Sequence, residues 1–554
     1  MYRMVCALAL ALPALPQVYT AGPQVVTFFS NVDDSDQPYG LYVPKDFEKS
    51  RKYPLVISLH GGLSNHRLNL RRVLGKGNLP GEADMEASRY FPKLPEVDYL
   101  VASPFARGTM GYRGIAEKDV YDVLAEVKKR FPVDEDRIYL TGLSMGGGGA
   151  LWLGLTRPDI WAAIAAVCPF APEESEPLAP NARNLAVHLF HGALDPAVPV
   201  AASRGWQKRL SEAGVPVEYV EYPSVRHNAW DWAYKDGAIF PWFSKHKREA
   251  FPAQVRFRTP AYKYAKAYWV VVTGLTPGET ASIDAKFTGQ NKVAVETSRL
   301  GGFTLQLEGH PQYSAGQPVE VTIDGTRLRG KAMAFSRKRG AWTAEPFMHS
   351  GESKRAGQEG PLSEAIAARH LYVYGTSGTT DEAKLAERRE QAAAAANWSS
   401  PRSRLLINLR VVSDREVNEY ELRHSNLVLF GTKETNLIIG RLADRLPLHL
   451  NAGAADYGLL YLWPTDGRYV AINSGLPFYT GIQHVKRKGL LFRAPFQLME
   501  TFEDFILFKG SLENVVAEGR FDGNWRAPEA LRVPEVERVV TLAPVAARTV
   551  PPAR

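Results

Sequence analysis

Short apolar runs alternate with stretches of helical periodicity over about residues 24–247. Most of the runs are nearly continuously apolar, which is typical of strands that are buried on both faces of a largely parallel sheet. They occupy residues 53–60, 98–104, 136–142, 161–169, 185–192 and 217–223. Between the second and third runs, residues 114–131 place Val120, Leu124 and Val127 on one face of a helix. This pattern predicts an α/β domain, a doubly wound and mostly parallel sheet with helices on both sides.

The pattern changes twice further along the chain. Residues 252–345 carry short alternating runs that are separated by Gly, Pro and Asn, which predicts a small β-sandwich-like module. Strand and helix patterns return over residues 362–554 and predict a C-terminal α/β domain of unknown role. Three such parts suit a chain of 554 residues. Polysaccharide binding is one hypothesis for the β-module, although its sequence shows no obvious aromatic platform.

Two segments of the C-terminal part share a plan. Residues 371–380 and 427–436 each place an apolar strand before a Gly-Thr-x-x-Thr loop and a helix. Free N–H groups at a helix start can bind an anion, and threonine at the same position can instead cap the helix. Neither loop matches a Walker loop or a dinucleotide fingerprint, so no nucleotide is predicted.

The N-terminus predicts export. Arg3 precedes an apolar run that ends near Pro16, too short to span a bilayer but suited to a signal peptide over residues 1–21. The protein is therefore expected to be secreted or periplasmic, and the alternative is a disordered cytosolic N-terminus. Cleavage would remove Cys6 and leave Cys168 without a partner for a disulfide, and Cys168 follows an apolar run that predicts burial.

Composition narrows the class of protein. The chain is 45% hydrophobic and 23% charged, which excludes disordered and collagen-like proteins. Its formal charge of +8 is modest for this length, and no dense Lys/Arg tract stands out. We therefore expect no nucleic-acid partner and interpret the charge as solvated surface. Apart from this N-terminal run, which is itself too short, no stretch of the sequence is long and apolar enough for a membrane span.

The sequence Gly142-Leu143-Ser144-Met145-Gly146 matches the motif G-x-S-x-G. The motif alone is weak, because short motifs of this kind also arise by chance. Here it follows a predicted strand and opens an apolar helix, the setting of a nucleophile elbow, and glycine on either side of Ser144 removes crowding from the tight turn. The three glycines that follow would let the helix start lie close to the sheet. Ser144 is thus a candidate nucleophile.

Asp195 and His227 complete a candidate triad. Each follows the C-terminal end of a predicted strand, and the order Ser144, Asp195, His227 is that of α/β-hydrolases. Ligands bind at this edge of a parallel sheet. Several alternatives stay open: Asp195 as a turn cap before Pro196, Asp231 or Asp236 as the acid, and His188 or His191 as the base.

An oxyanion hole needs two backbone N–H donors. Met145, the residue after the nucleophile, supplies one, and the sequence His60-Gly61-Gly62-Leu63 after an earlier strand supplies the other. Gly62 is the first choice and Leu63 the second. His60 is expected to brace this loop or to contact the substrate.

Three further features predict the substrate pocket. The segment 64–99 follows residues 60–63, which we call the oxyanion loop, and is expected to form one wall of the substrate pocket. Trp230 and Trp232 follow His227, and Trp230 could stack on a sugar or an aromatic acyl group; in the alternative, both indoles pack the last helix onto the sheet. Arg107 follows a strand and either steers a polar or carboxylate substrate or braces its loop.

The segments "LHGG", "ARGTMGYRGIAEKDVYDVL", "DRIYLTGLSMGGGGALWLGLTRPD", "HGALDPAVPV" and "RHNAWDWAY" carry a family resemblance. Over about residues 37–245 the chain resembles the α/β-hydrolases grouped with prolyl-oligopeptidase-type serine hydrolases. It is most similar to their esterase branch, which is polyhydroxybutyrate-depolymerase-like and feruloyl- or acetylxylan-esterase-like. The resemblance implies cleavage of a small-molecule or polysaccharide-linked ester through an acyl-enzyme, with no metal and no organic cofactor.

Two other functions compete with an esterase. A peptidase of the prolyl-oligopeptidase type would cleave short peptides, but those enzymes screen peptides with a large β-propeller. Here the hydrolase pattern starts near residue 24, which favours an ester bond. The second competitor is a binding protein built on an inactive hydrolase scaffold, and the intact set of Ser144, Asp195 and His227 argues against it.

Overall fold

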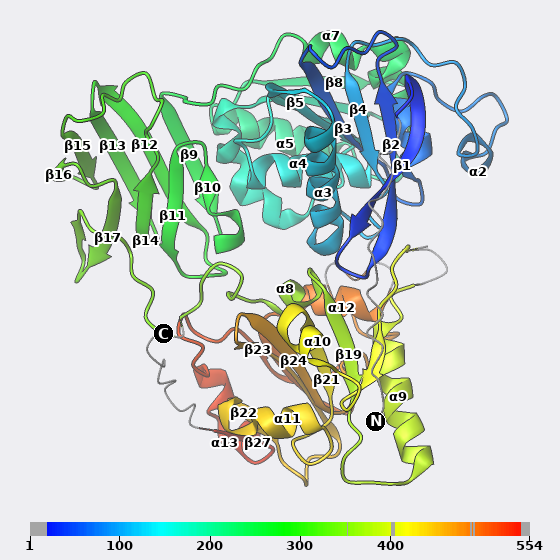
Figure 1. Ribbon diagram of the computed structural model, residues 1–554, viewed down its shortest axis with the longest axis vertical. Coiled ribbons are helices and arrows are strands. Elements are labelled where there is room, and N and C mark those ends of the chain that lie inside the picture. Colours follow the sequence, from blue (N-terminus) through cyan, green and yellow to red (C-terminus); the bar gives the residue numbers. More distant parts are fainter. Residues whose placement is uncertain (1–18, 352, 400–404, 488–489, 491–492, 544–554) are drawn as a thin grey trace, which may run out of the picture.

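The computed structural model describes residues 19–351, 353–399, 405–487, 490 and 493–543. Three parts follow one another along the chain: an N-terminal region (residues 22–243), a β-sandwich region (254–343) and a C-terminal region (362–542). In Figure 1 the N-terminal region lies at the top, the β-sandwich at the left and the C-terminal region below. The predicted signal peptide falls largely on residues 1–18, outside the described residues. No described helix is long and apolar enough to cross a membrane.

The N-terminal region contains an eight-stranded sheet of order β1-β2-β4-β3-β5-β6-β7-β8. Strands β3 to β8 are parallel, while β2 runs antiparallel to both β1 and β4. Its strands are β1 (Gly22–Ser30), β2 (Ser35–Val43), β3 (Tyr53–Leu59), β4 (Leu100–Pro104), β5 (Val133–Leu143), β6 (Ala163–Val167), β7 (Ala186–Gly192) and β8 (Val217–Tyr222). Every residue of β3, β4 and β6 is buried, which explains the continuous apolar runs and confirms the predicted doubly wound sheet.

Helices cover both faces of this sheet. They are α1 (His66–Val73), α2 (Asp84–Ala87), α3 (Gly114–Arg130), α4 (Met145–Thr156), α5 (Ala201–Glu212), α6 (Trp230–Ala233) and α7 (Ile239–Phe243), with 3-10 helices η1 (Glu173–Asn184) and η2 (Lys235–Gly237). Helix α3 buries Val120, Leu124 and Val127, so the predicted helical face is confirmed. It packs against the sheet between β1 and β4.

The β-sandwich region consists of two five-stranded sheets, of orders β10-β11-β14-β17-β18 and β16-β15-β13-β12-β9. The strands are β9 (Gln254–Thr259), β10 (Lys266–Ala267), β11 (Val270–Leu275), β12 (Ala281–Gly289), β13 (Lys292–Ser298), β14 (Leu300–Leu305), β15 (Val319–Ile323), β16 (Thr326–Gly330), β17 (Ala334–Lys338) and β18 (Ala341–Thr343), with η3 (Tyr262–Tyr264). Alternate residues point inward, as in β12, and form one apolar core around Trp269 and Phe287. Its tryptophans, Trp269 and Trp342, are buried and offer no exposed platform.

The C-terminal region is built on a seven-stranded sheet of order β20-β19-β21-β24-β23-β25-β26. Strands β20, β19, β21 and β24 are parallel, and β23, β25 and β26 continue the sheet in antiparallel fashion. The strands are β19 (His370–Tyr374), β20 (Val411–Ser413), β21 (Asn426–Phe430), β22 (Leu448–Leu450), β23 (Tyr457–Thr465), β24 (Arg468–Gly475), β25 (Phe505–Lys509), β26 (Val515–Gly519) and β27 (Val540–Leu542). The helices are α8 (Leu362–Ile366), α9 (Glu382–Ala396), α10 (Glu419–His424), α11 (Leu437–Leu442), α12 (Pro495–Thr501) and α13 (Pro534–Glu537), with η4 (Ala443–Arg445) and η5 (Glu529–Leu531).

The two Gly-Thr loops lie side by side at the ends of β19 and β21. The Ser377 N–H donates to Thr435 O at 3.0 Å, which joins one loop to the other. One oxygen of Asp414 accepts the N–H groups of Thr376 (3.0 Å) and Leu437 (2.7 Å). The helices α9 and α11 are capped by Asp381 and Asn436. A carboxylate of the chain itself therefore occupies the place where an anion could bind. The N-cap residues are not the predicted threonines, because the hydroxyls of Thr379 and Thr435 accept the N–H groups of Asp381 and Thr432 instead.

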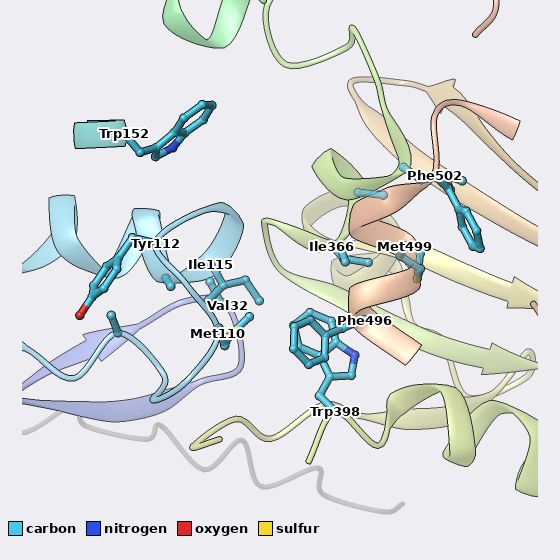
Figure 2. Packing of buried hydrophobic residues seen from close by; sticks show 14 of the residues in the cluster. Val32, Met110, Tyr112, Ile115, Trp152, Ile366, Trp398, Phe496, Met499 and Phe502 are labelled. Carbon is cyan, nitrogen blue, oxygen red and sulfur yellow. The ribbon is translucent and has the colours of Figure 1, made fainter. Parts of the chain in front are cut away.

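The C-terminal region docks at the edge of the N-terminal sheet where the parallel strands end. The turn between β1 and β2 and the loop after β4 both lie at this edge, because Tyr39 pairs with Pro104. Arg369 forms an ion pair with Asp34 of that turn, and the Leu406 N–H donates to the Arg107 carbonyl. One hydrophobic cluster runs from α3 to α8 and α12 across the junction (Figure 2).

Candidate active site

Ser144 sits on a sharp turn between β5 and α4. Its φ of 55° and ψ of −118° are unusual for a residue with a side chain, and such strain persists only where the surroundings hold it. The Ser144 N–H donates to the Val167 carbonyl at 2.8 Å, and its own carbonyl accepts the Phe170 N–H at 3.1 Å. The turn lifts the hydroxyl above the end of the sheet, as predicted for a nucleophile elbow.

Glycine is required on both sides of this turn. A Cβ on Gly142 would collide with the Gly146 carbonyl, and one on Gly146 would collide with the Leu59 carbonyl. Gly147 and Gly148 leave no room for a side chain either, because the backbone at Val167 and Phe170 crosses directly over the helix start. The predicted division of roles is confirmed: two glycines allow the elbow, and those after it allow close packing.

His227 links Ser144 to Asp195. Its Nε2 lies 3.0 Å from Ser144 Oγ, and its Nδ1 lies 2.7 Å from Asp195 Oδ2. The Asp195 side chain is fully buried, whereas that of His227 is 25% exposed. The structure therefore brings together the three residues that the sequence singled out, with an imidazole that can reach both a hydroxyl and a carboxylate.

Hydrogen bonds from His227 and from the backbone keep Asp195 ionised. Burial raises the pKa of its carboxyl, but the bonds from His227 and from the N–H groups of Val198 and Ala197 outweigh burial and hold the pKa below its usual value. The Asp195 Oδ1 accepts both N–H groups, at 2.8 and 2.9 Å, which leaves Oδ2 for the imidazole. Asp195 caps its turn and also orients His227, so the two predicted roles coexist.

The alternative candidates for the acid and the base of the triad do not contact the Ser144 hydroxyl. Asp231 accepts a bond from Asn228, and Asp236 follows at an exposed turn. His191 is buried and contacts Ser203, the Val198 carbonyl and, at 3.2 Å, Asp195. His188 packs against the rings of Phe190 and Trp242. Only His227 pairs with the Ser144 hydroxyl among the described residues.

The oxyanion loop passes directly beside the elbow. A Cβ on Gly61 would lie 3.4 Å from the Cβ of Ser144. Within the described part of the chain, no protein group accepts the N–H of Gly62, an exposed residue, whereas the Leu63 N–H donates to Thr109 Oγ1 at 2.8 Å. Met145 is the first residue of α4, so its N–H has no partner within the helix. Gly62 and Met145 are thus the two candidate donors, and Leu63 is turned away.

Comparison with known proteins agrees with this geometry. A family model described as phospholipase/carboxylesterase matches residues 118–236, the stretch from α3 through the elbow to just beyond His227. The N-terminal region has an α/β-hydrolase fold. We call it the hydrolase region from here on.

Individual relatives each cover less than half of this chain. A dipeptidyl-peptidase 5 from Porphyromonas gingivalis is 28% identical over 145 residues, which are 23% of this chain and 18% of that protein. The chain thus spans less than a fifth of the curated relative's length. The structure of a thermostable esterase is 26% identical over 41% of this chain and 63% of its own, with a TM-score of 0.32. A ferulic acid esterase is 21% identical over 41% of this chain and 99% of its own, with a TM-score of 0.33.

Two of the residues suggested for substrate contact lie inside the hydrolase region. Arg107 is fully buried and forms ion pairs with Asp33 and Asp119, each at 2.7 Å, so it braces its loop and cannot steer a substrate. His60 is also buried, with ring nitrogens 2.8 Å from the carbonyls of Gly61 and Phe105. Burial lowers the pKa of His60 below its ordinary value and outweighs the two carbonyls, which raise it. A neutral ring can donate to only one of the two carbonyls, and in either tautomer His60 is a buried brace of its loop.

Trp230 lies beside the triad. Its ring meets that of His227 edge to face, with centroids 5.3 Å apart, and the Arg72 guanidinium lies 5.2 Å from its centre. A cavity of about 290 Å³ opens there. It is lined by Arg72, Gly75, Gly77, Asn78, Trp230, Asp231 and Lys235. Part of the segment 64–99 lines this cavity together with residues of α6, and none of the triad residues is among its lining; that the segment forms a wall of the substrate pocket stays a prediction. Trp232 points elsewhere, toward Tyr222, and is 44% exposed.

Three large apolar side chains are exposed around the triad. Leu63 follows Gly62, Leu194 precedes Asp195, and Phe170 is bonded to the carbonyl of Ser144. Their exposed fractions are 65%, 61% and 53%. Cys168 is buried, and burial raises the pKa of its thiol to about 12, as expected of an inert cysteine.

Sequence reasoning did not identify Thr109 or the acidic partners of Arg107. As a candidate site, the segment "PFARGTMGYRG" contributed only Arg107. Asp33 lies 74 residues earlier in the chain, and no periodic pattern joins the two. Two successive residues at positive φ, Ala106 (46°) and Arg107 (64°), mark the loop as held by its surroundings. The sequence carries no signal for that strain, because neither residue is glycine.

Proposed function

We propose that the hydrolase region cleaves carboxylic esters through an acyl-enzyme on Ser144. One observation carries the proposal: a single imidazole lies 3.0 Å from the Ser144 hydroxyl and 2.7 Å from an ionised, buried Asp195. A serine hydroxyl is a weak nucleophile at its free pKa and needs such a base and such an orienting acid. The strained turn and the adjacent N–H groups of Met145 and Gly62 suit the same chemistry.

The reaction proceeds in two halves. Ser144 Oγ attacks the ester carbonyl while His227 Nε2 takes the hydroxyl proton, and the N–H groups of Met145 and Gly62 donate to the oxyanion. The C–O bond to the alcohol then breaks as His227 returns the proton to the leaving oxygen. Water attacks the acyl-enzyme with His227 again as base, which releases the acid and restores Ser144. Asp195 stays ionised throughout and stabilises the imidazolium. The steps call for no metal and no organic cofactor.

Two parts of the site favour an ester whose acyl group is apolar and whose alcohol is polar. The exposed side chains of Leu63, Phe170 and Leu194 favour an apolar or aromatic acyl group, such as a feruloyl group, close to Ser144. The cavity beside Trp230 combines one indole with charged and amide groups, which favours a polar group such as a sugar hydroxyl. The proposed substrate is therefore an ester linked to a small polar alcohol or a polysaccharide, encountered outside the cytoplasm after export.

Ser144→Ala tests the proposal on a panel of p-nitrophenyl acetate, butyrate and long-chain esters and a feruloyl ester. We expect turnover to fall by at least about 10⁴-fold on every accepted ester. Ser211→Ala, on the exposed face of α5, is the matched control and should keep the full rate. A Ser144→Ala protein that retains the wild-type rate would contradict the proposal.

The same panel addresses the alternative of a serine peptidase of the prolyl-oligopeptidase type, which the match to a dipeptidyl-peptidase keeps in view. Aminoacyl and dipeptidyl p-nitroanilides are added as amide substrates. Ester turnover with a kcat/KM at least 100-fold above that for the best anilide supports the esterase. The reverse ratio, abolished by Ser144→Ala, would identify the peptidase.

A further inference from the structure

The loop of residues 105–113, between β4 and α3, connects the oxyanion loop to the C-terminal region. On one side it holds the oxyanion loop at three points. Thr109 Oγ1 accepts the Leu63 N–H at 2.8 Å, the Phe105 carbonyl lies 2.8 Å from His60 Nε2, and the Tyr112 hydroxyl donates to the His60 carbonyl at 3.0 Å. Two loops from different strands are thereby fixed to each other beside Ser144.

The other side of the loop is held by charge at Arg107. The guanidinium reaches Asp119, Asp33 and the Ser30 hydroxyl, at 2.7, 2.7 and 2.6 Å. The side chains of Arg107, Asp33 and Asp119 are fully buried and form ion pairs. The loop therefore cannot move without leaving a buried charge unpaired.

The C-terminal region completes this arrangement. The Leu406 N–H donates to the Arg107 carbonyl at 3.2 Å, and the Asn408 N–H donates to Asp33 at 3.0 Å, the carboxylate that already pairs with Arg107. Met110, within the loop, belongs to the same hydrophobic cluster as Phe496 of the C-terminal region (Figure 2). Polar and apolar contacts from that region thus meet the loop on the side away from Ser144.

Backbone conformation shows that these contacts hold the loops against a local preference. Ala106, Arg107 and Leu63 have φ of 46°, 64° and 61°. Each such residue with a side chain costs on the order of 1 kcal/mol or more. Leu63 keeps this conformation while its side chain is 65% exposed, so packing does not hold it. Its bond to Thr109 is the contact that remains, and that bond directs the Leu63 N–H away from the site.

We propose that the C-terminal region positions the oxyanion loop through residues 105–113, and that Thr109 is the positioning residue at the end of this chain of contacts. The inference rests on the proposed esterase function. Thr109 does not touch the substrate. It holds Leu63 so that the neighbouring Gly62 N–H, rather than that of Leu63, faces the reacting carbonyl oxygen. The C-terminal region thereby contributes to catalysis through its contacts with the hydrolase region. Its own Gly-Thr loops bind no anion in this scheme, because Asp414 accepts their free N–H groups.

The first test compares Thr109→Val with Thr109→Ser. Valine has nearly the same shape but cannot accept the Leu63 N–H, whereas serine keeps the hydroxyl. For the valine variant we expect kcat to fall by about 10- to 100-fold with KM changed less than about two-fold. A trifluoromethyl ketone, which forms an oxyanion on Ser144, should bind more weakly by the same factor as the fall in kcat/KM. The serine variant should recover most of both losses.

The second test addresses the C-terminal region in the full-length protein. Arg107→Lys keeps a cation but loses the planar fork that reaches Asp119, Asp33, Ser30 and, across the junction, the Leu406 carbonyl at 3.4 Å. We expect it to lower kcat by at least about ten-fold. Arg369→Gln is the matched control, because it cuts the ion pair to Asp34 across the same junction without touching the loop. It should leave kcat and the inhibitor affinity unchanged. Met110→Ala, which alters only the apolar contact, keeps the test available if Arg107→Lys does not fold.

The outcomes separate this inference from the proposed function. A fully active Ser144→Ala protein overturns both. If Ser144→Ala is inactive but Thr109→Val binds the trifluoromethyl ketone as tightly as the wild type, Thr109 has no positioning role and this inference alone fails. A third outcome is that Thr109→Val lowers kcat and the inhibitor affinity, whereas folded Arg107→Lys and Met110→Ala keep both, as Arg369→Gln does. The oxyanion loop would then not depend on the C-terminal region, and that part of the inference is overturned.

Discussion

Asp195 directs one carboxylate oxygen at His227 Nδ1 from 2.7 Å and commits the other to two backbone N–H groups. The carboxylate cannot rotate without breaking those two bonds, so the imidazole has one orientation and one tautomer. Neutral His227 then carries its proton on Nδ1 and presents a free Nε2 to Ser144. The acid therefore acts through the placement of a proton as well as through its charge.

Asp195→Asn is expected to abolish most activity while the protein keeps its fold. An amide is the same size, but its NH2 group facing His227 would favour the tautomer that carries the proton on Nε2. We expect kcat to fall by roughly 10³- to 10⁴-fold on ester substrates, with little change in KM. Asp236→Asn, at an exposed turn, is the control and should keep the wild-type rate. Equal activity of both variants would show that Asp195 does not orient the base.

Gly148, which follows the elbow, and Gly453 should respond differently to the same Gly→Ala substitution. Gly148→Ala would drive a methyl group into the Phe170 carbonyl, and relieving that collision should cost about 1–3 kcal/mol, seen as a melting temperature lower by several degrees. Gly453→Ala is the matched substitution, because a methyl group there meets no atom within 4 Å. Scanning calorimetry of both variants checks this. A Gly148→Ala protein as stable as Gly453→Ala would mean that the chain crossing over α4 is not held as described.

Trp230 and Trp232 should differ in their effect on substrate binding. Trp230 lines the cavity and contacts His227, whereas Trp232 faces Tyr222. For an ester of a sugar alcohol we expect Trp230→Ala to raise KM about ten-fold and Trp232→Ala to change it less than two-fold. With p-nitrophenyl acetate, which is too small to fill the cavity, both variants should resemble the wild type. A Trp230→Ala effect of equal size on both substrates would indicate damage to His227 instead of loss of a binding surface.

The parts of this structure that sequence could predict are those set by local pattern. Ser144 and Asp195 each follow a strand that an apolar run predicts, and His227 follows a strand that also contains Glu218 and Glu221. The carboxyl ends of parallel strands lie at one edge of the sheet, which is where ligands bind. Arg107 follows a strand as well, and the same reasoning suggested substrate contact for it. Its true partners include Asp33, 74 residues away, and Leu406, 299 residues away. Such contacts depend on how regions dock, which no hydrophobic period encodes.

The choice between Gly62 and Leu63 shows the same limit at shorter range. The sequence His60-Gly61-Gly62-Leu63 offers several N–H groups in a row, and composition favours glycine only in general. The decision rests on Thr109, 46 residues further along, whose hydroxyl accepts the Leu63 N–H. A side chain from another loop thus decides which backbone group is available to the site.

His188 predicts how stability depends on pH. Burial lowers the pKa of this histidine to about 4, against 6.5 for an ordinary one, and its ring packs between Phe190 and Trp242 with only 8% of the residue exposed. Between pH 6.5 and 4 the unfolded chain binds a proton at this position that the folded chain does not bind. Stability is therefore lost as the pH falls through this window, by about 2 kcal/mol at pH 5.

His188→Leu should remove this dependence. We expect the melting temperature of the wild type to fall further between pH 7.5 and pH 5 than that of His188→Leu, because leucine has no proton to bind in either state. His484→Gln, at an exposed histidine, is the control and should follow the wild type. Calorimetry at half-unit steps of pH measures all three proteins. Parallel curves for the wild type and His188→Leu would mean that His188 is protonated in the folded protein at pH 5, and that its strand opens to water.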